Sequence, residues 1–119
     1  MKRNQRLHSP ADFARVREAS PRVWAHPLLV LYVASNDLDH ARVGITVSGR
    51  VGKAVVRNKV RRRIREALRT RPVGLAAGND LVVIARPRSA AASWTELNVA
   101  LDSVLGRAGA TARPSGGGV

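Results

Sequence analysis

The sequence predicts a single-domain α+β fold whose elements follow in the order helix, strands, helix, strand, helix. Three observations lead to this fold class. Residues 42–48 alternate between apolar and small polar side chains, which is typical of a half-buried strand. Residues 54–69 repeat their apolar side chains at helical spacing. Residues 81–85 form a continuous apolar run that is typical of a central strand. A length of 119 residues suits one domain with its own core.

The first helix has a clear start signal. Ser9 suits the N-cap, Pro10 the first helical position, and Asp12 the positively polarised first turn. Ser20 and the proline after it end the helix. Residues 1–8, which precede the helix, are interpreted as a flexible basic arm.

Two strands follow this helix. Residues 28–34 are densely aliphatic and predict a strand that is buried along most of its length. After a turn, alternation in the next strand places one set of side chains in the core and a second set outside. The core set is Val43, Ile45 and Val47, and the outer set is Gly44, Thr46 and Ser48. Because the outer set is small and polar, it leaves room for another molecule to approach closely.

The helix of residues 54–69 has two different faces. Its apolar stripe consists of Val56, Val60, Ile64, Ala67 and Leu68, and its cationic ladder of Arg57, Arg61, Arg65 and Arg69. Like charges four residues apart weaken a helix by about 0.2–0.5 kcal/mol per pair. Only Glu66 offsets them within the helix. Evenly spaced cations therefore favour a partner with evenly spaced negative charge, and phosphates are the first candidate. A solvated face is the alternative, but mixed signs would serve solubility better.

The end of the chain predicts one more helix and a tail. Ser93 and Glu96 form a capping box at the start of the helix. The apolar face of this helix is Leu97, Leu101, Val104 and Leu105. Small and polar residues dominate residues 110–119, which predicts a disordered tail. The folded domain is therefore expected to span residues 9–109.

The charge of the chain restricts its partners. Lys and Arg number 21 against 8 Asp and Glu, which gives a formal net charge of +13. A field this positive predicts a polyanion, either nucleic acid or an anionic membrane. There is no Cys and hence no thiol nucleophile or thiolate metal site. The longest apolar run, residues 27–34, is too short to span a bilayer. We therefore expect a cytoplasmic protein without a membrane partner.

No catalytic residue and no metal site are predicted. No two acidic residues lie three or four positions apart, and His8, His26 and His40 fall in separate segments. A histidine-based nuclease needs two imidazoles at one phosphate, so a protein-only nuclease is disfavoured. One residue, Asn58, points to binding instead. Asn58 places an amide, which bonds backbone, base or ribose, among the arginines. Phe13 is interpreted either as a core residue or as a stacking platform for an unpaired base.

Four segments form a more specific pattern. They are Arg6-Leu7 with Asp12-Phe13, residues 42–48, residues 51–66 with the sequence VGKAVVRNKVRRRIRE, and residues 81–86. Together they resemble the signature of the bacterial ribonuclease P protein subunit, over nearly the whole domain. The resemblance implies a single-domain α-β sandwich like domain 2 of ribosomal protein S5, with a left-handed strand–helix–strand crossover.

The resemblance also implies a function. In this family a large RNA with bound Mg²⁺ cleaves precursor tRNA and releases its 5′ leader, and the protein adds affinity for the substrate. The implied assembly is a ribonucleoprotein endoribonuclease. Its implied partners are the catalytic RNA and precursor tRNA, with no obligate protein partner. Charge alone leaves one alternative open, a non-enzymatic RNA-binding protein of ribosomal or nucleoid type.

Two sets of site residues follow from the resemblance. The set for the catalytic RNA is Arg57, Asn58, Lys59, Arg61, Arg62 and Arg65. The set for the single-stranded leader, in a cleft between the first helix and the open sheet face, is Phe13, Arg17, Ser48, Arg50, Lys53, Arg86 and Arg88. The chain departs from the family pattern at Lys59, where arginine is usual, at Gly49, where a basic residue is usual, and at Arg17, where an aromatic residue is common. Members of the family carry an aromatic residue on a strand, and its position corresponds here to either Leu31 or Tyr32.

Overall fold

The computed structural model describes residues 5–71 and 74–111 of the chain. Its elements are α1 (Pro10–Ala19), β1 (Trp24–Ala25), β2 (Leu29–Ser35), β3 (Arg42–Val47), α2 (Ala54–Arg69), β4 (Asn79–Ala85), the 3₁₀ helix η2 (Pro87–Ala91) and α3 (Trp94–Ala108). The predicted order of helices and strands is confirmed. The short elements β1 and η2 are additions that the sequence pattern does not reveal, because neither is long enough to display a period.

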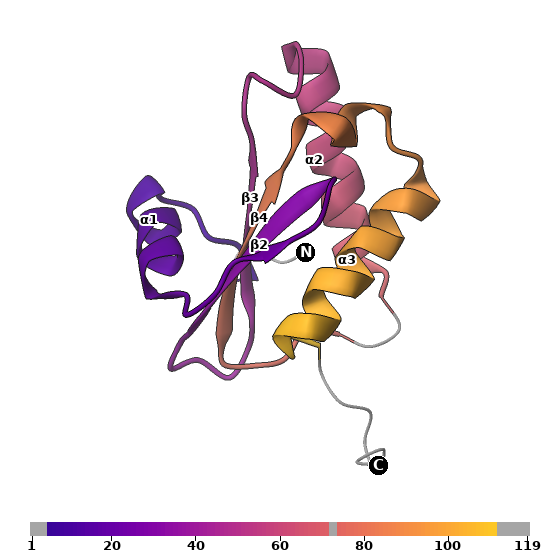
Figure 1. The fold of residues 1–119 in the computed structure, drawn as a ribbon. Coiled ribbons are helices and arrows are strands. Elements are labelled where there is room, and N and C mark those ends of the chain that lie inside the picture. The colour runs from indigo at the N-terminus through magenta and orange to yellow at the C-terminus, as the bar shows by residue number, and fades with distance from the viewer. Residues whose placement is uncertain (1–4, 72–73, 112–119) are drawn as a thin grey trace.

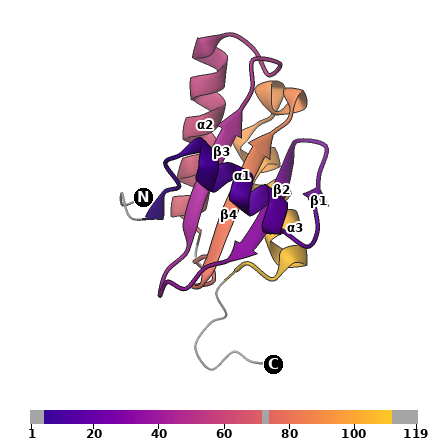
Figure 2. The same cartoon turned by 90° about the vertical axis from the view of Figure 1, so that its left-hand side faces the viewer.

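The sheet is four-stranded and mixed, in the order β1-β2-β4-β3. Strand β4 pairs antiparallel with β2 and parallel with β3, so α2 connects two parallel neighbours. Helices α2 and α3 lie on one face of the sheet and α1 on the other (Figure 1). Seen from the α1 side, the chain rises along β3, passes behind the sheet through α2, and rises again along β4 to the right of β3 (Figure 2). The crossover is therefore left-handed, against the usual preference and as the resemblance implies.

The main core lies between the sheet and the two long helices. The apolar stripe predicted for α2 is buried there, except for the half-buried Val56. From α3 the core takes Leu97, Ala100, Leu101, Val104 and Leu105, and from the three long strands Leu29, Leu31, Val43, Val47, Leu81, Val83 and Ala85. Each of these strands alternates, so its other side chains face α1.

The register of the strands arranges the α1 face of the sheet in rows. The first row is Ala34, Asp80 and Arg42, the second is Tyr32, Val82 and Gly44, and the third is Val30, Ile84 and Thr46. Because directly paired residues share a face, the rows also decide which strand residue faces α1. Tyr32 faces α1, whereas Leu31 is fully buried in the main core.

A buried carboxylate joins α1 to the sheet. Asp80 is fully buried. Arg42 of the neighbouring strand donates to both of its oxygens, from Nε at 2.9 Å and from Nη2 at 2.7 Å. Asn36 donates from Nδ2 at 2.7 Å, and Arg15 reaches the same carboxylate from α1. Burial by itself would raise the pKa of Asp80, but the hydrogen bonds from Arg42, Asn36 and Arg15 outweigh burial and lower it to about 2.

The helix ends follow the predicted capping. The Ser9 hydroxyl accepts from the backbone N–H of Asp12 at 3.1 Å, and the predicted capping box of α3 is present. Helix α3 ends at Gly109, whose φ of 65° lies in the left-handed region that glycine adopts without strain.

The ordered domain extends beyond its predicted limits at both ends. Leu7 is buried, and its N–H donates to the Val43 carbonyl at 2.9 Å, so the described part of the predicted arm is attached to the edge of β3. Ala110 is 1% exposed and accepts a hydrogen bond from the N–H of Ala76. The interpretation of residues 5–8 as a flexible arm and of Ala110 as tail is therefore wrong. Both segments form backbone hydrogen bonds with distant parts of the chain, and such bonds cannot be predicted from charge or composition. The rest of the predicted arm and tail, residues 1–4 and 112–119, lies outside the described residues.

The charge of Asp80 is expected to make stability depend on pH. Its pKa is about 2 in the folded protein and ordinarily 3.8, so its ionised form favours folding above pH 4 and this contribution disappears as the pH falls toward 2. We expect the free energy of unfolding to lose about 2 kcal/mol from this group across that interval. Urea denaturation at a series of pH values measures the loss.

Two variants calibrate this measurement. Asp80→Asn removes the group and should flatten the profile between pH 4 and pH 2. Asp37→Asn, a matched change at an exposed turn residue, should leave the profile as it is in the native chain. Equal slopes in all three proteins would contradict a depressed pKa at Asp80.

Candidate nucleic-acid interface

Helix α1 lies over the first two rows of its sheet face. Val16, its one fully buried residue among those described, packs in a small cluster with Leu7, Ala34 and Val82. The end of the helix is attached by Ser20, whose hydroxyl accepts from the N–H of Val33 at 3.0 Å. These contacts fix α1 close to the sheet and leave the third row beside it.

The ring of Phe13 lies directly on Gly44. A methyl group at Gly44 would come within 2.5 Å of Phe13 Cζ, so only glycine permits this packing. The prediction that Gly44 leaves room for another molecule is therefore wrong, because the Phe13 ring already fills that room. Phe13 is half-buried and packs with Tyr32 and Ile84. The packing of Phe13 agrees with its interpretation as a core residue, while part of its side chain remains accessible; its role as a stacking platform stays a prediction.

The third row remains partly accessible. We call Val30, Thr46 and Ile84 the open strip; all three side chains are half-buried. On one side of the strip are α1, Phe13 and Tyr32. Arg17 is exposed and lies on the flank of α1 opposite Arg15, because residues two apart are turned by about 200° in an α-helix.

The other side of the open strip is cationic. Strands β3 and β4 are parallel, so the residues that follow them lie at the same end of the sheet. These residues are Ser48, Arg50, Lys53, Arg86 and Arg88, and all of them are exposed. The structure therefore brings most of the predicted leader set to two sides of one strip, with Phe13 and Arg17 on the helix side and Ser48, Arg50, Lys53 and Arg86 at the strand ends. Arg88 lies at the same end of the sheet but borders a cavity that α3 helps to line.

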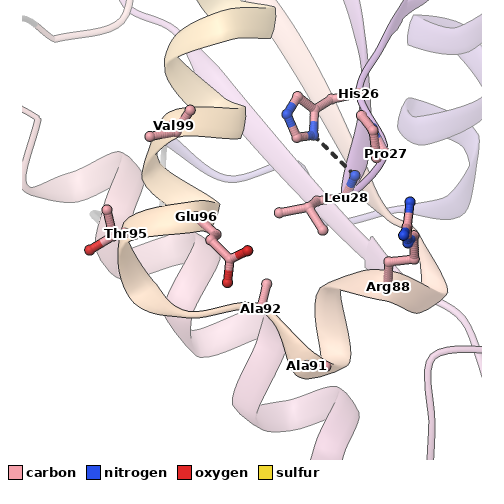
Figure 3. Close-up of a pocket in the computed structure, with 9 residues that line it drawn as sticks. All are labelled: His26, Pro27, Leu28, Arg88, Ala91, Ala92, Thr95, Glu96 and Val99. Atoms are coloured by element: carbon pink, nitrogen blue, oxygen red, sulfur yellow. Dashed lines mark hydrogen bonds between the residues drawn. The ribbon is translucent and has the colours of Figure 1, made fainter.

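A cavity of about 510 Å³ opens at this same end, beneath the turn between β1 and β2 (Figure 3). Its walls are Pro27, Leu28, Ala91, Ala92 and Val99, and its polar lining is His26, Arg88, Thr95 and Glu96. His26 Nδ1 accepts a hydrogen bond from the N–H of Leu28 at 3.0 Å, which holds the ring over the cavity. Of the predicted leader residues, Arg88 is the one that borders this cavity.

The predicted residues for the catalytic RNA form a second surface on α2. Asn58, Lys59 and Arg62 are exposed on the outer face of the helix. Arg57, Arg61 and Arg65 are half-buried on the flank next to them. The Asn58 amide oxygen accepts from Arg61 Nη1 at 3.0 Å, so this amide orients the arginine rather than capping the helix. The ladder thus follows one flank of α2, and its last member, Arg69, is paired with Glu66.

Like charges converge at the middle of this flank. Desolvation, together with the positive charges of Arg6 and Arg61, lowers the pKa of Arg65. Arg6 lies there because the N-terminal segment forms a bridge to Val43 at the sheet edge. An anion placed here would relieve the repulsion and gain several donors, as a phosphate does between arginines. The basic pattern of α2 does not reveal Arg6 as a member of this group; only the apolar Leu7 beside it indicates that the segment is attached.

Other arginines hold the fold together. Arg63 Nη1 donates to the carbonyl of Ala92 at 3.0 Å, which connects α2 to the start of α3. Arg71 is paired with Asp102 across the same two helices. Arg107 Nη2 donates to the carbonyl of Ala25 at 2.7 Å. These side chains account for part of the positive charge without any partner outside the chain.

The described residues contain no group of three or more His, Cys, Asp or Glu side chains arranged to hold a metal ion. Within the same residues, no helix is long and apolar enough to cross a membrane.

Comparisons with known proteins agree on one family. Residues 1–109 match the family model described as Ribonuclease P. The ribonuclease P protein components of Herpetosiphon aurantiacus and Roseiflexus castenholzii are 43% and 42% identical to this chain, over 91% and 92% of its length and 87% and 89% of theirs.

Solved structures give the same result. A Staphylococcus aureus RNase P protein mutant with defective mRNA degradation activity superimposes with a TM-score of 0.82 at 33% identity, over 90% of both chains. The RNase P protein from Thermotoga maritima gives a TM-score of 0.77 at 28% identity, over 86% of this chain and 96% of its own. This chain therefore belongs to the ribonuclease P protein family, the protein component of a ribonucleoprotein endoribonuclease that processes the 5′ leader of tRNA together with an RNA subunit.

Proposed function

We propose that the two surfaces bind two different RNAs. The flank and outer face of α2 contact the catalytic RNA through Arg57, Asn58, Lys59, Arg61, Arg62 and Arg65. The open strip and its borders hold the single-stranded 5′ leader of precursor tRNA through Phe13, Tyr32, Arg17, Ser48, Arg50, Lys53, Arg86 and Arg88. The observation that carries the proposal is the open strip itself, a partly accessible and mostly apolar row with aromatic rings on one side and cations on the other.

The chemistry of the open strip suits a single strand of RNA. Unpaired bases stack on aromatic and apolar side chains, and arginine and lysine neutralise the phosphates between them. Neither interaction reads the edge of a base, so binding tolerates many leader sequences. This tolerance suits a protein that serves many tRNA precursors.

The chemistry of α2 suits a structured RNA. Two of its arginines are restricted before binding, since Asn58 orients Arg61 and the side chain of Arg65 is half-buried. A preorganised arginine loses less conformational freedom when it pairs with a phosphate. Lys59 keeps a positive charge at a position where the family usually has arginine, and makes a less directional contact.

The remaining parts of the proposal rest on the family. We propose that the RNA subunit carries out the cleavage with Mg²⁺ bound mainly by RNA, that no further protein is obligatory, and that the protein acts in the cytoplasm. The protein then contributes substrate affinity and assembly rather than catalytic side chains.

Reconstitution tests the proposed function. The protein is combined with a bacterial ribonuclease P RNA, and cleavage of precursor tRNA is followed at low Mg²⁺ concentration. We expect removal of the leader to require both components. Cleavage that is unchanged by the protein would contradict the proposal. Cleavage by the protein alone would support the hypothesis of a protein-only nuclease.

Neutralising α2 is expected to weaken docking on the catalytic RNA. The double variant Arg61→Gln and Arg65→Gln removes two cations that pair with phosphate, so the slope of log K against log salt concentration should fall by about 0.7–0.9 for each phosphate left unpaired. Filter binding to the catalytic RNA at several salt concentrations measures the slope. Arg107→Gln, which removes a charge on α3 far from α2's basic flank, should leave the slope unchanged. An unaltered slope in the double variant would mean that neither arginine touches phosphate.

Removing the Phe13 ring is expected to reduce the affinity for the leader. Stacking on an aromatic side chain contributes about 1–3 kcal/mol per base, so Phe13→Ala should weaken binding of precursor tRNA by about five-fold or more without affecting mature tRNA. Phe13→Leu is the matched variant, because it refills the space above Gly44 but offers no aromatic face. If Phe13→Leu binds precursor tRNA as the native protein does, Phe13 serves packing and not stacking.

A further inference from the structure

Helix α1 has little apolar surface in contact with the sheet. Of its ten residues only Val16 is fully buried, and Phe13 is half-buried. An isolated helix of this length is not stable in water, so tertiary contacts must hold it. Because the rim of the open strip is built on α1, the contacts that hold α1 also determine the shape of the strip.

Helix α1 is fixed on opposite flanks by two different interactions. On one flank Arg15 reaches Asp80 in the first row of the sheet. On the other flank the Phe13 ring packs on Gly44 in the second row. The Arg15 side chain is 45% exposed while Asp80 is fully buried, so the arginine extends from the helix surface down to the sheet. Releasing this arginine frees one flank and lets α1 rotate or lift, which moves Phe13 and Arg17 relative to the strip.

Arg15 is not required to neutralise Asp80. Arg42 already donates to both carboxylate oxygens, and Asn36 adds a third donor. The carboxylate is therefore satisfied within the sheet and the turn between β2 and β3. What the Arg15 interaction adds is the connection to α1.

We propose that Arg15 and Asp80 are positioning residues for the leader: their ion pair holds α1 at the orientation in which Phe13 borders the open strip. This inference rests on the proposed leader function. Neither residue acts in the cleavage step, so their loss should raise KM for precursor tRNA and leave kcat unchanged.

Two variants test the proposal in the reconstituted holoenzyme. Arg15→Met keeps the length of the stem and leaves the pairing of Arg42 with Asp80 intact. Asp80→Asn removes the carboxylate. The measured quantity is the ratio of the affinities for precursor tRNA and mature tRNA. We expect each variant to lower this ratio about three- to ten-fold, because only the fraction of molecules with α1 in place binds the leader fully. Arg15→Lys, which restores a single charged interaction, should recover part of the ratio.

The Asp80 variant separates positioning from simple electrostatics. Asp80→Asn makes the protein more positive, so charge alone predicts tighter binding of both RNAs. A positioning role for Asp80 instead predicts weaker discrimination between precursor tRNA, which carries the leader, and mature tRNA. Amide hydrogen exchange gives a second readout, since α1 should exchange faster in both variants while α3 is unchanged.

Controls distinguish failure of this inference from failure of the proposed function. Arg107→Met removes the same charge and one hydrogen bond between elements, and should leave the ratio unchanged. If the native holoenzyme itself does not discriminate precursor from mature tRNA, the proposed function fails. If the native protein discriminates and Arg15→Met does so equally, the positioning role is wrong. Equal weakening for both tRNAs would also overturn it. Should Asp80→Asn not fold, Arg15→Met decides the outcome.

Discussion

The structure depends on how the carboxylate of Asp80 is satisfied inside the protein. A buried charge is costly unless hydrogen bonds and opposite charges surround it, and removing one partner of such a group leaves a large penalty. Here the partners come from three places: Arg42 on the adjacent strand, Asn36 on the turn, and Arg15 on the helix across the face. One side chain thus joins an edge strand, the turn between β2 and β3, and a helix that share few apolar contacts.

Arginine has two roles in this chain, and charge alone does not separate them. Some arginines hold the fold, as Arg42, Arg63 and Arg71 do through partners within the protein. Others gather where they repel one another, as Arg61 and Arg65 do beside Arg6. Self-repulsion is the reason that we assign the second group to the proposed contact with a polyanion. A net charge of +13 therefore overstates how much of the surface is available for RNA.

Most elements could be predicted from the sequence because each carries a local signal. The caps at Ser9 and Ser93 and the stripe from Val60 to Leu68 follow from spacing and hydrogen-bonding chemistry alone. The residues that α2 itself contributes to the basic surface could be predicted in the same way, since one helix carries them. Arg6 could not, because it joins this surface through the contact of the N-terminal segment with β3. The placement of Phe13 over Gly44 could not, because the contact joins residues far apart in the sequence. Alternation correctly indicates which face Gly44 is on, but it says nothing about what covers that face.

The same limit applies to the edges of the domain and to Tyr32. Leu7 and Ala110 are held by backbone hydrogen bonds to distant segments, and the composition of the chain does not predict such bonds. Whether Leu31 or Tyr32 faces α1 depends on the register of β2 against β4. A shift of one residue in this register reverses the two faces, and sequence patterns do not exclude such a shift. Function therefore followed from local chemistry and family resemblance, whereas the shape of the proposed leader site required the fold.

The hand of the crossover explains why this sheet has a partly accessible strip at all. With β3 next to β4 in their present order, a right-handed connection would carry α2 to the face that α1 occupies. The sixteen-residue helix would then lie across Val30, Thr46 and Ile84 and bury them as core. The left-handed path instead sends the long helix to the far face and leaves only the ten-residue α1 here. An uncommon chirality thus keeps one row of this face partly accessible, and the proposed binding of an extended nucleic acid depends on that row.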